Sequence, residues 1–65
     1  MFEIENVNEY KYRMWRSDDH IGDFSYYHSS WCFELAGEIV KETNPNIFPF
    51  ILKTLENLNN GVVYE

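Results

Sequence analysis

Apolar and polar side chains alternate along most of the first sixteen positions, and this period of two is typical of a half-buried strand rather than of a helix. The apolar members of the pattern are Phe2, Ile4, Tyr10, Tyr12 and Met14. We expect residues 2 to 16 to form an antiparallel hairpin with Ile4 opposite Tyr12. This register also places Glu3 opposite Arg13 on the other face, where their charges attract. It leaves a three-residue loop around Asn8, which tolerates a left-handed conformation.

The middle of the chain combines a polar loop, an aromatic run and a helical pattern. Residues 17 to 23 contain three aspartates and one glycine, which predicts a loop, and residues 24 to 28 suit a third strand. From Ser30 the apolar spacing changes to three and four residues, which predicts an amphipathic helix over residues 30 to 43. Its apolar stripe consists of Trp31, Cys32, Leu35, Ala36, Ile39 and Val40.

A second helix is expected to begin near Phe48, with Pro49 in its first turn, where the missing amide hydrogen is not needed. Its predicted apolar stripe contains Phe48, Ile51, Leu52, Leu55 and Leu58. Gly61 is placed for a left-handed cap, and residues 62 to 64 form either a last strand or a tail packed on that helix. Together these elements predict one α+β domain over residues 1–65, with a small antiparallel sheet of three or four strands and two helices packed on one face.

The charge balance is strongly acidic, with eleven Asp and Glu against five Lys and Arg and a formal net charge of −6. A field of this sign repels phosphates, so we exclude direct binding to nucleic acid. No apolar run approaches the length of about 18 residues that a membrane span needs, and the first ten residues carry acids where a signal peptide requires a basic region. We therefore expect a cytoplasmic protein with no membrane contact.

Cys32 is the single cysteine, so a disulfide within the chain is excluded. In the first turn of the predicted helix its thiol would be activated by the helix dipole, with His28 just ahead of it as a base. However, Cys32 also falls on the apolar stripe, where a cysteine acts as a small hydrophobic residue. Because no orienting group or oxyanion site can be recognised, we interpret Cys32 as structural and expect neither enzyme activity nor a cofactor.

The loop residues Asp18, Asp19, His20 and Asp23 are of the types that bind metal ions. Their spacing does not match an EF-hand loop, which needs acids at alternate positions and a terminal glutamate. A set of His20, His28, Cys32 and Asp23 matches no known zinc signature. No metal is therefore expected, and the acids and the glycine of this loop are interpreted as turn residues.

Three glutamates, Glu34, Glu38 and Glu42, recur every four residues on the polar side of the first predicted helix. Like charges at this spacing repel each other by roughly a few tenths of a kcal/mol. One interpretation is an ordinary solvated face. The alternative is a carboxylate stripe that mimics a run of phosphates and, together with the aspartates of the preceding loop, binds a basic partner.

Trp15 and Tyr27 are the aromatic residues that alternation places on the face away from Ile4 and Tyr12. They either pair across the sheet for local stability or anchor a partner, because exposed Trp and Tyr are enriched at binding hot spots. The residues expected to contact a partner are therefore Glu34, Glu38, Glu42, Asp18, Asp19, Asp23, Trp15 and Tyr27.

In length, acidity, lack of a catalytic motif and expected element order, the chain resembles small phage-encoded inhibitors such as anti-CRISPR proteins and DNA mimics. The resemblance implies that it occupies the basic nucleic-acid channel of a target enzyme in the host cytoplasm. The prediction is thus a non-catalytic acidic protein that binds and inhibits or modulates a basic, nucleic-acid-binding partner protein. Two alternatives stay open: an antitoxin-like or immunity-like partner of a basic toxin, and a structural subunit that forms a homodimer or a larger assembly through exposed aromatics.

Overall fold

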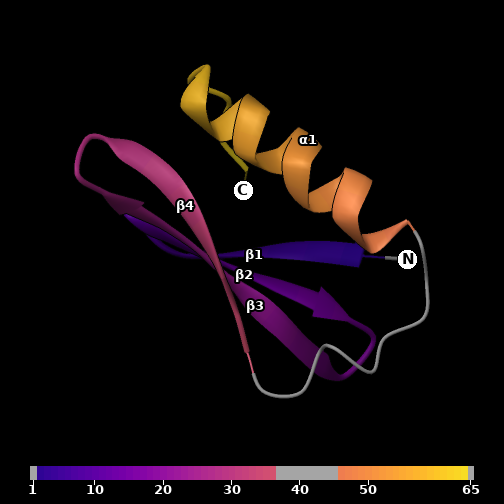
Figure 1. The fold of residues 1–65 in the computed structure, drawn as a ribbon. Coiled ribbons are helices and arrows are strands. Elements are labelled where there is room, and N and C mark those ends of the chain that lie inside the picture. Colours follow the sequence, from indigo (N-terminus) through magenta and orange to yellow (C-terminus); the bar gives the residue numbers. More distant parts are fainter. Residues whose placement is uncertain (1, 37–45, 65) are drawn as a thin grey trace.

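The computed structural model describes residues 2–36 and 46–64. Five elements follow one another in this part of the chain: β1 (Phe2–Asn8), β2 (Lys11–Arg16), β3 (Asp19–Tyr27), β4 (Ser30–Leu35) and α1 (Ile47–Asn59). The strands form one four-stranded sheet in the order β1-β2-β3-β4, and each strand pairs antiparallel with its neighbour. Because α1 lies along one face of this sheet (Figure 1), the predicted α+β class is confirmed.

The helix predicted over residues 30 to 43 is not formed at its start, because residues 30–35 belong to strand β4. Exposed and partly buried positions alternate along most of this strand, and Trp31 and Phe33 are the ones that pack against the core. Residues 37–43 of the same prediction lie outside the described residues. The sheet therefore has four strands, and α1 is the one helix in the part of the chain that the structure describes.

A tight turn at His28 and Ser29 explains this difference. Both residues have positive φ, 51° and 70°, as a type I′ hairpin turn requires, and they direct the chain back along β3. The returning strand brings Phe33 opposite Phe24, with ring centroids 4.8 Å apart. This aromatic pair stabilises the strand through packing that the apolar spacing within the segment does not reveal.

The hairpin of β1 and β2 is confirmed, but its predicted register is wrong, since Ile4 lies opposite Met14 rather than Tyr12. The register is displaced by an even number of residues, so each of these side chains keeps the face that alternation predicted. Asn8 is not in a left-handed conformation. Instead, its side-chain Oδ1 accepts the backbone N–H of Tyr10 at 2.8 Å, and this bond shapes the turn between the two strands.

A bulge in β3 decides which of its residues reach each face of the sheet. The strand contains one additional residue, Ile21, between the positions that pair with Met14 and with Trp15. In a regular strand, side chains three residues apart would point to opposite faces. The additional residue allows His20 and Asp23 to share a face, where their side chains contact each other.

The polar loop predicted over residues 17 to 23 is mostly strand, because β3 begins at Asp19. Gly22 lies inside this strand, where the ring of Phe33 and the backbone oxygen of Glu34 come very near. A Cβ atom at this position would lie 2.5 Å from each of them. Gly22 therefore permits close packing of β3 against β4 rather than a turn.

The buried side of α1 agrees only in part with the apolar stripe that the sequence predicts. The buried residues of the helix are Ile47, Ile51, Thr54 and Leu58. Phe48 and Leu52, which belong to the predicted stripe, are 62% and 67% exposed. The helix buries Ile47 and Thr54 in their place, and the buried Thr54 hydroxyl is satisfied because it donates to the carbonyl of Phe50 at 2.8 Å.

The two ends of α1 contact the two edge strands. Near its start, Phe50 packs on Phe2 of β1 with ring centroids 5.1 Å apart. At its end, the Asn59 side chain accepts the backbone N–H of Trp31 in β4 at 2.8 Å. The helix thus crosses the sheet from β1 to β4 (Figure 1) and protects part of the β4 edge.

The end of α1 agrees with the prediction of a left-handed cap, since Gly61 has a φ of 89°. Its N–H donates to the carbonyl of Leu58 at 3.1 Å, and the N–H of Val62 donates to the carbonyl of Asn57 at 2.9 Å. This pair of bonds is the Schellman arrangement, in which glycine is favoured. The following residues form a tail packed on the helix rather than a strand, because the Asn57 amide donates to the hydroxyl of Tyr64 at 2.9 Å.

The core lies between α1 and the sheet. Its buried apolar residues are Tyr12, Met14, Ile21, Phe24, Ile47, Ile51 and Leu58. Partly buried rings pack around this cluster, so aromatic residues supply much of the apolar area that a small chain must bury. Within residues 2–36 and 46–64, no helix has the length and apolar character needed to cross a membrane.

Candidate partner-binding face of the sheet

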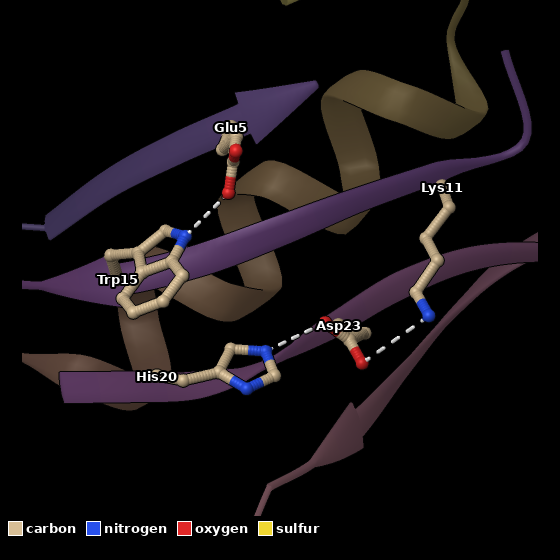
Figure 2. Close-up of polar contacts among 5 residues, drawn as sticks. All are labelled: Glu5, Lys11, Trp15, His20 and Asp23. Atoms are coloured by element: carbon tan, nitrogen blue, oxygen red, sulfur yellow. Dashed lines mark hydrogen bonds and ion pairs between the residues drawn. The ribbon is translucent and has the colours of Figure 1, made fainter. Parts of the chain in front are cut away.

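The face of the sheet that points away from α1 is covered by no element of the described chain, and we call it the open face. Strand alternation and the cross-strand register define its members. Its charged and aromatic residues are Glu3, Glu5, Lys11, Arg13, Trp15, His20, Asp23, Tyr27 and Glu34. Figure 2 shows five of these side chains in front of the strands, with the ribbon of α1 behind.

Four charged residues form a row across the open face, one from each strand. Arg13 lies opposite Glu5 on one side and opposite Asp23 on the other. Glu34 lies opposite Asp23 on the outer strand β4. Lys11 Nζ also approaches Oδ2 of Asp23, at 3.8 Å. Arg13 therefore lies between two carboxylates, and both edge strands carry acids on the open face.

Trp15 is held in position by contacts on both sides of its ring system. Its indole Nε1 donates to Oε1 of Glu5 at 2.8 Å, and its ring centroid lies 5.2 Å from that of His20. Nε2 of His20 lies 2.8 Å from Oδ1 of Asp23. Figure 2 shows this sequence of contacts, which continues to Lys11. A side chain that is already oriented loses less conformational entropy when a partner binds.

Tyr27 lies at the far end of β3 and is 63% exposed. Its ring centroid lies 4.1 Å from that of His28 in the following turn. His20 and Trp15 mark the other end of the open face, and at about 3.3 Å per residue the two aromatic positions lie roughly 20 Å apart. The open face therefore has an exposed ring at one end and an oriented indole at the other.

The structure places on one face of the sheet four of the residues that the sequence predicts as partner contacts: Trp15, Asp23, Tyr27 and Glu34. The placement of Glu34 on a helix is wrong, since it is an exposed residue of strand β4. Glu38 and Glu42, the other members of the predicted stripe, lie outside the described residues. The open face also contains Glu3 and Glu5. Alternation alone predicts that both lie on this face, whereas their proximity to Trp15 depends on the register between β1 and β2.

Cys32 does not occupy the buried position that the sequence predicts, because it lies exposed on strand β4. The interpretation as a small hydrophobic core residue is therefore wrong. In the observed register Cys32 lies opposite Ser25, on the same side of the sheet as Glu34. The predicted position depended on the helix at residues 30 to 43, and alternation along the strand places the thiol on the open face instead.

The acidic segment before β3 is divided between a turn and the strand. Asp18 lies in the turn, and Asp19 is the first residue of β3. Among the described residues, no group of three or more His, Cys, Asp and Glu side chains is arranged to hold a metal ion. The short contact between His20 and Asp23 is accordingly a polar contact that fixes the His20 ring against Trp15.

The open face combines two kinds of group that bind basic side chains. Carboxylates form ion pairs with Lys and Arg, and the faces of Trp and Tyr rings attract cations.

Comparison of the chain with protein-family models, with curated proteins and with solved structures finds no match.

Proposed function

We propose that this chain is an acidic binding protein that docks through its open face on a basic surface of a partner protein. The partner is a nucleic-acid-binding protein, which the contact inhibits or modulates. One observation carries the proposal: Trp15 and Tyr27 share an uncovered sheet face with carboxylates from β1, β3 and β4. Aromatic side chains supply the apolar contact area of binding hot spots, and carboxylates complement Lys and Arg on the partner.

The form of the open face favours a macromolecular partner. Sites for small molecules are concave and bury most of the ligand, whereas an uncovered sheet face is broad. The formal net charge of −6 adds a long-range attraction toward a basic partner and speeds their association. The same charge opposes direct contact with nucleic acid, so the basic surface is proposed to belong to a protein.

Inhibition follows from occupancy of the basic surface. A protein that binds nucleic acid holds phosphates with Lys and Arg, and carboxylates of the open face would take the place of those phosphates. Glu34 is the exposed carboxylate that a partner cation can contact on β4, since both oxygens of Asp23 opposite it already contact His20 and Lys11. This mode of action is the one that the resemblance to small phage-encoded inhibitors implies.

The experiment is a capture of lysate proteins by the tagged 65-residue chain, with identification by mass spectrometry. Three variants accompany the wild type: Trp15→Ala, Glu34→Gln and the control Glu56→Gln, which removes one charge from the exposed side of α1. We expect the wild type and the control to retain the same basic nucleic-acid-binding protein, and the two open-face variants to lose most of it. Retention by Trp15→Ala and Glu34→Gln, with both variants folded, would overturn the proposal.

The same experiment separates the two alternatives. A captured toxin would favour an antitoxin-like or immunity-like function of the same face. Capture of a second copy of the chain, resistant to 1 M salt, would favour self-association through aromatic contacts, because the Debye length falls to about 3 Å at that concentration and ion pairs weaken.

A further inference from the structure

A second surface feature lies on the helix side of the sheet, apart from the open face. It is a hollow of about 360 Å³ between the β1–β2 turn, the start of β4 and the end of α1. Small-molecule sites begin at about 300 Å³, so the hollow has the volume of a small one. Its residues come from four separate segments, which the fold alone brings together.

The ring of Trp31, backed by the buried ring of Tyr12, forms one wall of the hollow. Tyr12 and Trp31 both line it, and their ring centroids lie 5.4 Å apart with an angle of 47° between the planes. Trp31 also packs on Tyr26, with centroids 5.6 Å apart, and its backbone N–H donates to the Asn59 side chain. The hydroxyl of Tyr12 accepts the backbone N–H of Tyr64 at 3.4 Å. The aromatic wall is therefore fixed by the fold before any ligand binds.

The remaining walls are mostly apolar, with one carboxylate and the neutral side chain of Asn6. Leu58 and Val62 contribute alkyl groups, and Glu9 contributes a carboxylate at the β1–β2 turn. Gly61, at the C-terminal cap of α1, also lines the hollow, and the C-terminal end of a helix carries a partial negative charge. The lining residues include no Lys or Arg among the described part of the chain. The local field therefore favours a cation.

The composition of the walls selects the kind of cation. A metal ion such as Ca²⁺ needs at least about six oxygen ligands, and a single carboxylate with apolar neighbours does not supply them. An ammonium ion surrounded by alkyl groups matches both features, because its alkyl surface packs on the apolar wall and its charge interacts with the ring of the partly exposed Trp31 and with Glu9.

We propose that this hollow binds an alkylated ammonium group, of the trimethylammonium type. The proposal does not depend on the function of the open face, since the hollow is lined by core-side residues such as Trp31 and Leu58, on the other side of the sheet. Such a group is present both in free quaternary ammonium compounds and in the side chain of trimethylated lysine, and the experiment distinguishes the two sources.

The experiment is an NMR titration of the full chain with choline, and with its neutral carbon isostere 3,3-dimethylbutan-1-ol at the same concentrations. We expect choline to shift the indole N–H of Trp31 and the amide of Gly61 in a saturable manner, with the isostere at least about fivefold weaker, since a cation–π contact at a partly exposed site is worth about a kcal/mol. A peptide with one trimethyl-lysine forms the second arm. Tighter binding of the peptide assigns the site to a protein side chain, and tighter binding of choline assigns it to a free compound.

Substitution of Glu9 by glutamine tests the contribution of the carboxylate. Glu9 is exposed, so Glu9→Gln should fold normally and weaken choline binding about two- to fivefold, the range of an exposed ion pair. The matched control is Glu3→Gln, which removes the same charge from the open face and should leave the affinity unchanged. Equal shifts by choline and its isostere, no saturable shift by choline or the peptide, or equal losses in the two variants would overturn the proposal.

Discussion

Trp15 and Glu5 are joined across the β1–β2 pair by a hydrogen bond of 2.8 Å from the indole Nε1 to the carboxylate Oε1. In the observed register between β1 and β2, Glu5 lies opposite Arg13, so the bond from Trp15 to Glu5 runs diagonally along the open face. Diagonal neighbours are within reach of long aromatic side chains. The bond orients the indole, whose ring also contacts His20, and it thereby fixes the aromatic end of the open face.

Removal of this bond should release Trp15 without unfolding the protein. We expect Glu5→Ala to lower the free energy of unfolding by less than about 1 kcal/mol, because both partners of the bond are accessible to water. The indole N–H of Trp15 should then exchange faster with solvent, which NMR measures directly. Glu3→Ala is the matched control, and equal acceleration in both variants would show that the bond to Glu5 does not orient the ring.

The β3–β4 turn offers a stabilising substitution. His28 and Ser29 have φ of 51° and 70°, a conformation that glycine and asparagine adopt more readily than most residues. We expect His28→Asn and Ser29→Gly each to raise the free energy of unfolding by about 0.5 to 1 kcal/mol, because relief of the left-handed strain exceeds the added entropy of the unfolded chain, as thermal or urea unfolding would show. Ser30→Gly, inside strand β4, should lower it by a similar amount. A loss of stability in Ser29→Gly would contradict the turn conformation.

Gly22 should be sensitive to the addition of a single methyl group. A Cβ atom there would meet the Phe33 ring and the Glu34 backbone at 2.5 Å, so we expect Gly22→Ala to cost about 1 to 3 kcal/mol and to disturb the β3–β4 pairing. Gly61→Ala meets no atom within 4 Å, and its cost of about 1 to 2 kcal/mol comes from the positive φ alone. Cross-strand NMR contacts distinguish the variants: they should change in Gly22→Ala and persist in Gly61→Ala.

The orientation of α1 can be tested with two adjacent residues. Ile51 is 7% exposed and Leu52 is 67% exposed. Ile51→Ala should therefore lower the free energy of unfolding by about 2 to 5 kcal/mol, the range for a buried aliphatic residue. Leu52→Ala should change it by no more than about 0.5 kcal/mol. The predicted stripe contains both residues, so similar large losses of stability in the two variants would favour that stripe over the observed one.

The faces of β1 and β2 can be predicted from the sequence, but their register cannot. Alternation is local, so the apolar side of the hairpin follows directly from residue types. Two registers that differ by two residues bury the same side chains and both pair acids with bases, with Arg13 opposite Glu3 in one and opposite Glu5 in the other. The shorter turn and the side-chain bond of Asn8 favour the observed register, and these are geometric features of the folded hairpin.

Strand β4 shows a second limit of sequence-based prediction. Between Trp31 and Leu35 the apolar residues fit both a helical period and an alternating one. Two features decide in favour of the strand: the turn at His28 and the packing of Phe33 on Phe24. The packing joins residues on different strands. The candidate site can likewise be predicted only in part. Alternation predicts the face on which Trp15 and Tyr27 lie, whereas the position of Glu34 opposite Asp23 requires the correct third and fourth strands.

The most direct test of the proposed docking surface is a cross-saturation NMR experiment on the isotope-labelled chain bound to the unlabelled protein that it captures. We predict that saturation transfers to open-face residues, above all to the indole of Trp15 and to Tyr27 and Glu34, and that Phe48 and Leu52 on the exposed side of α1 are unaffected. Transfer confined to α1, with Trp15 and Tyr27 unaffected, would contradict the assignment of the open face as the binding surface.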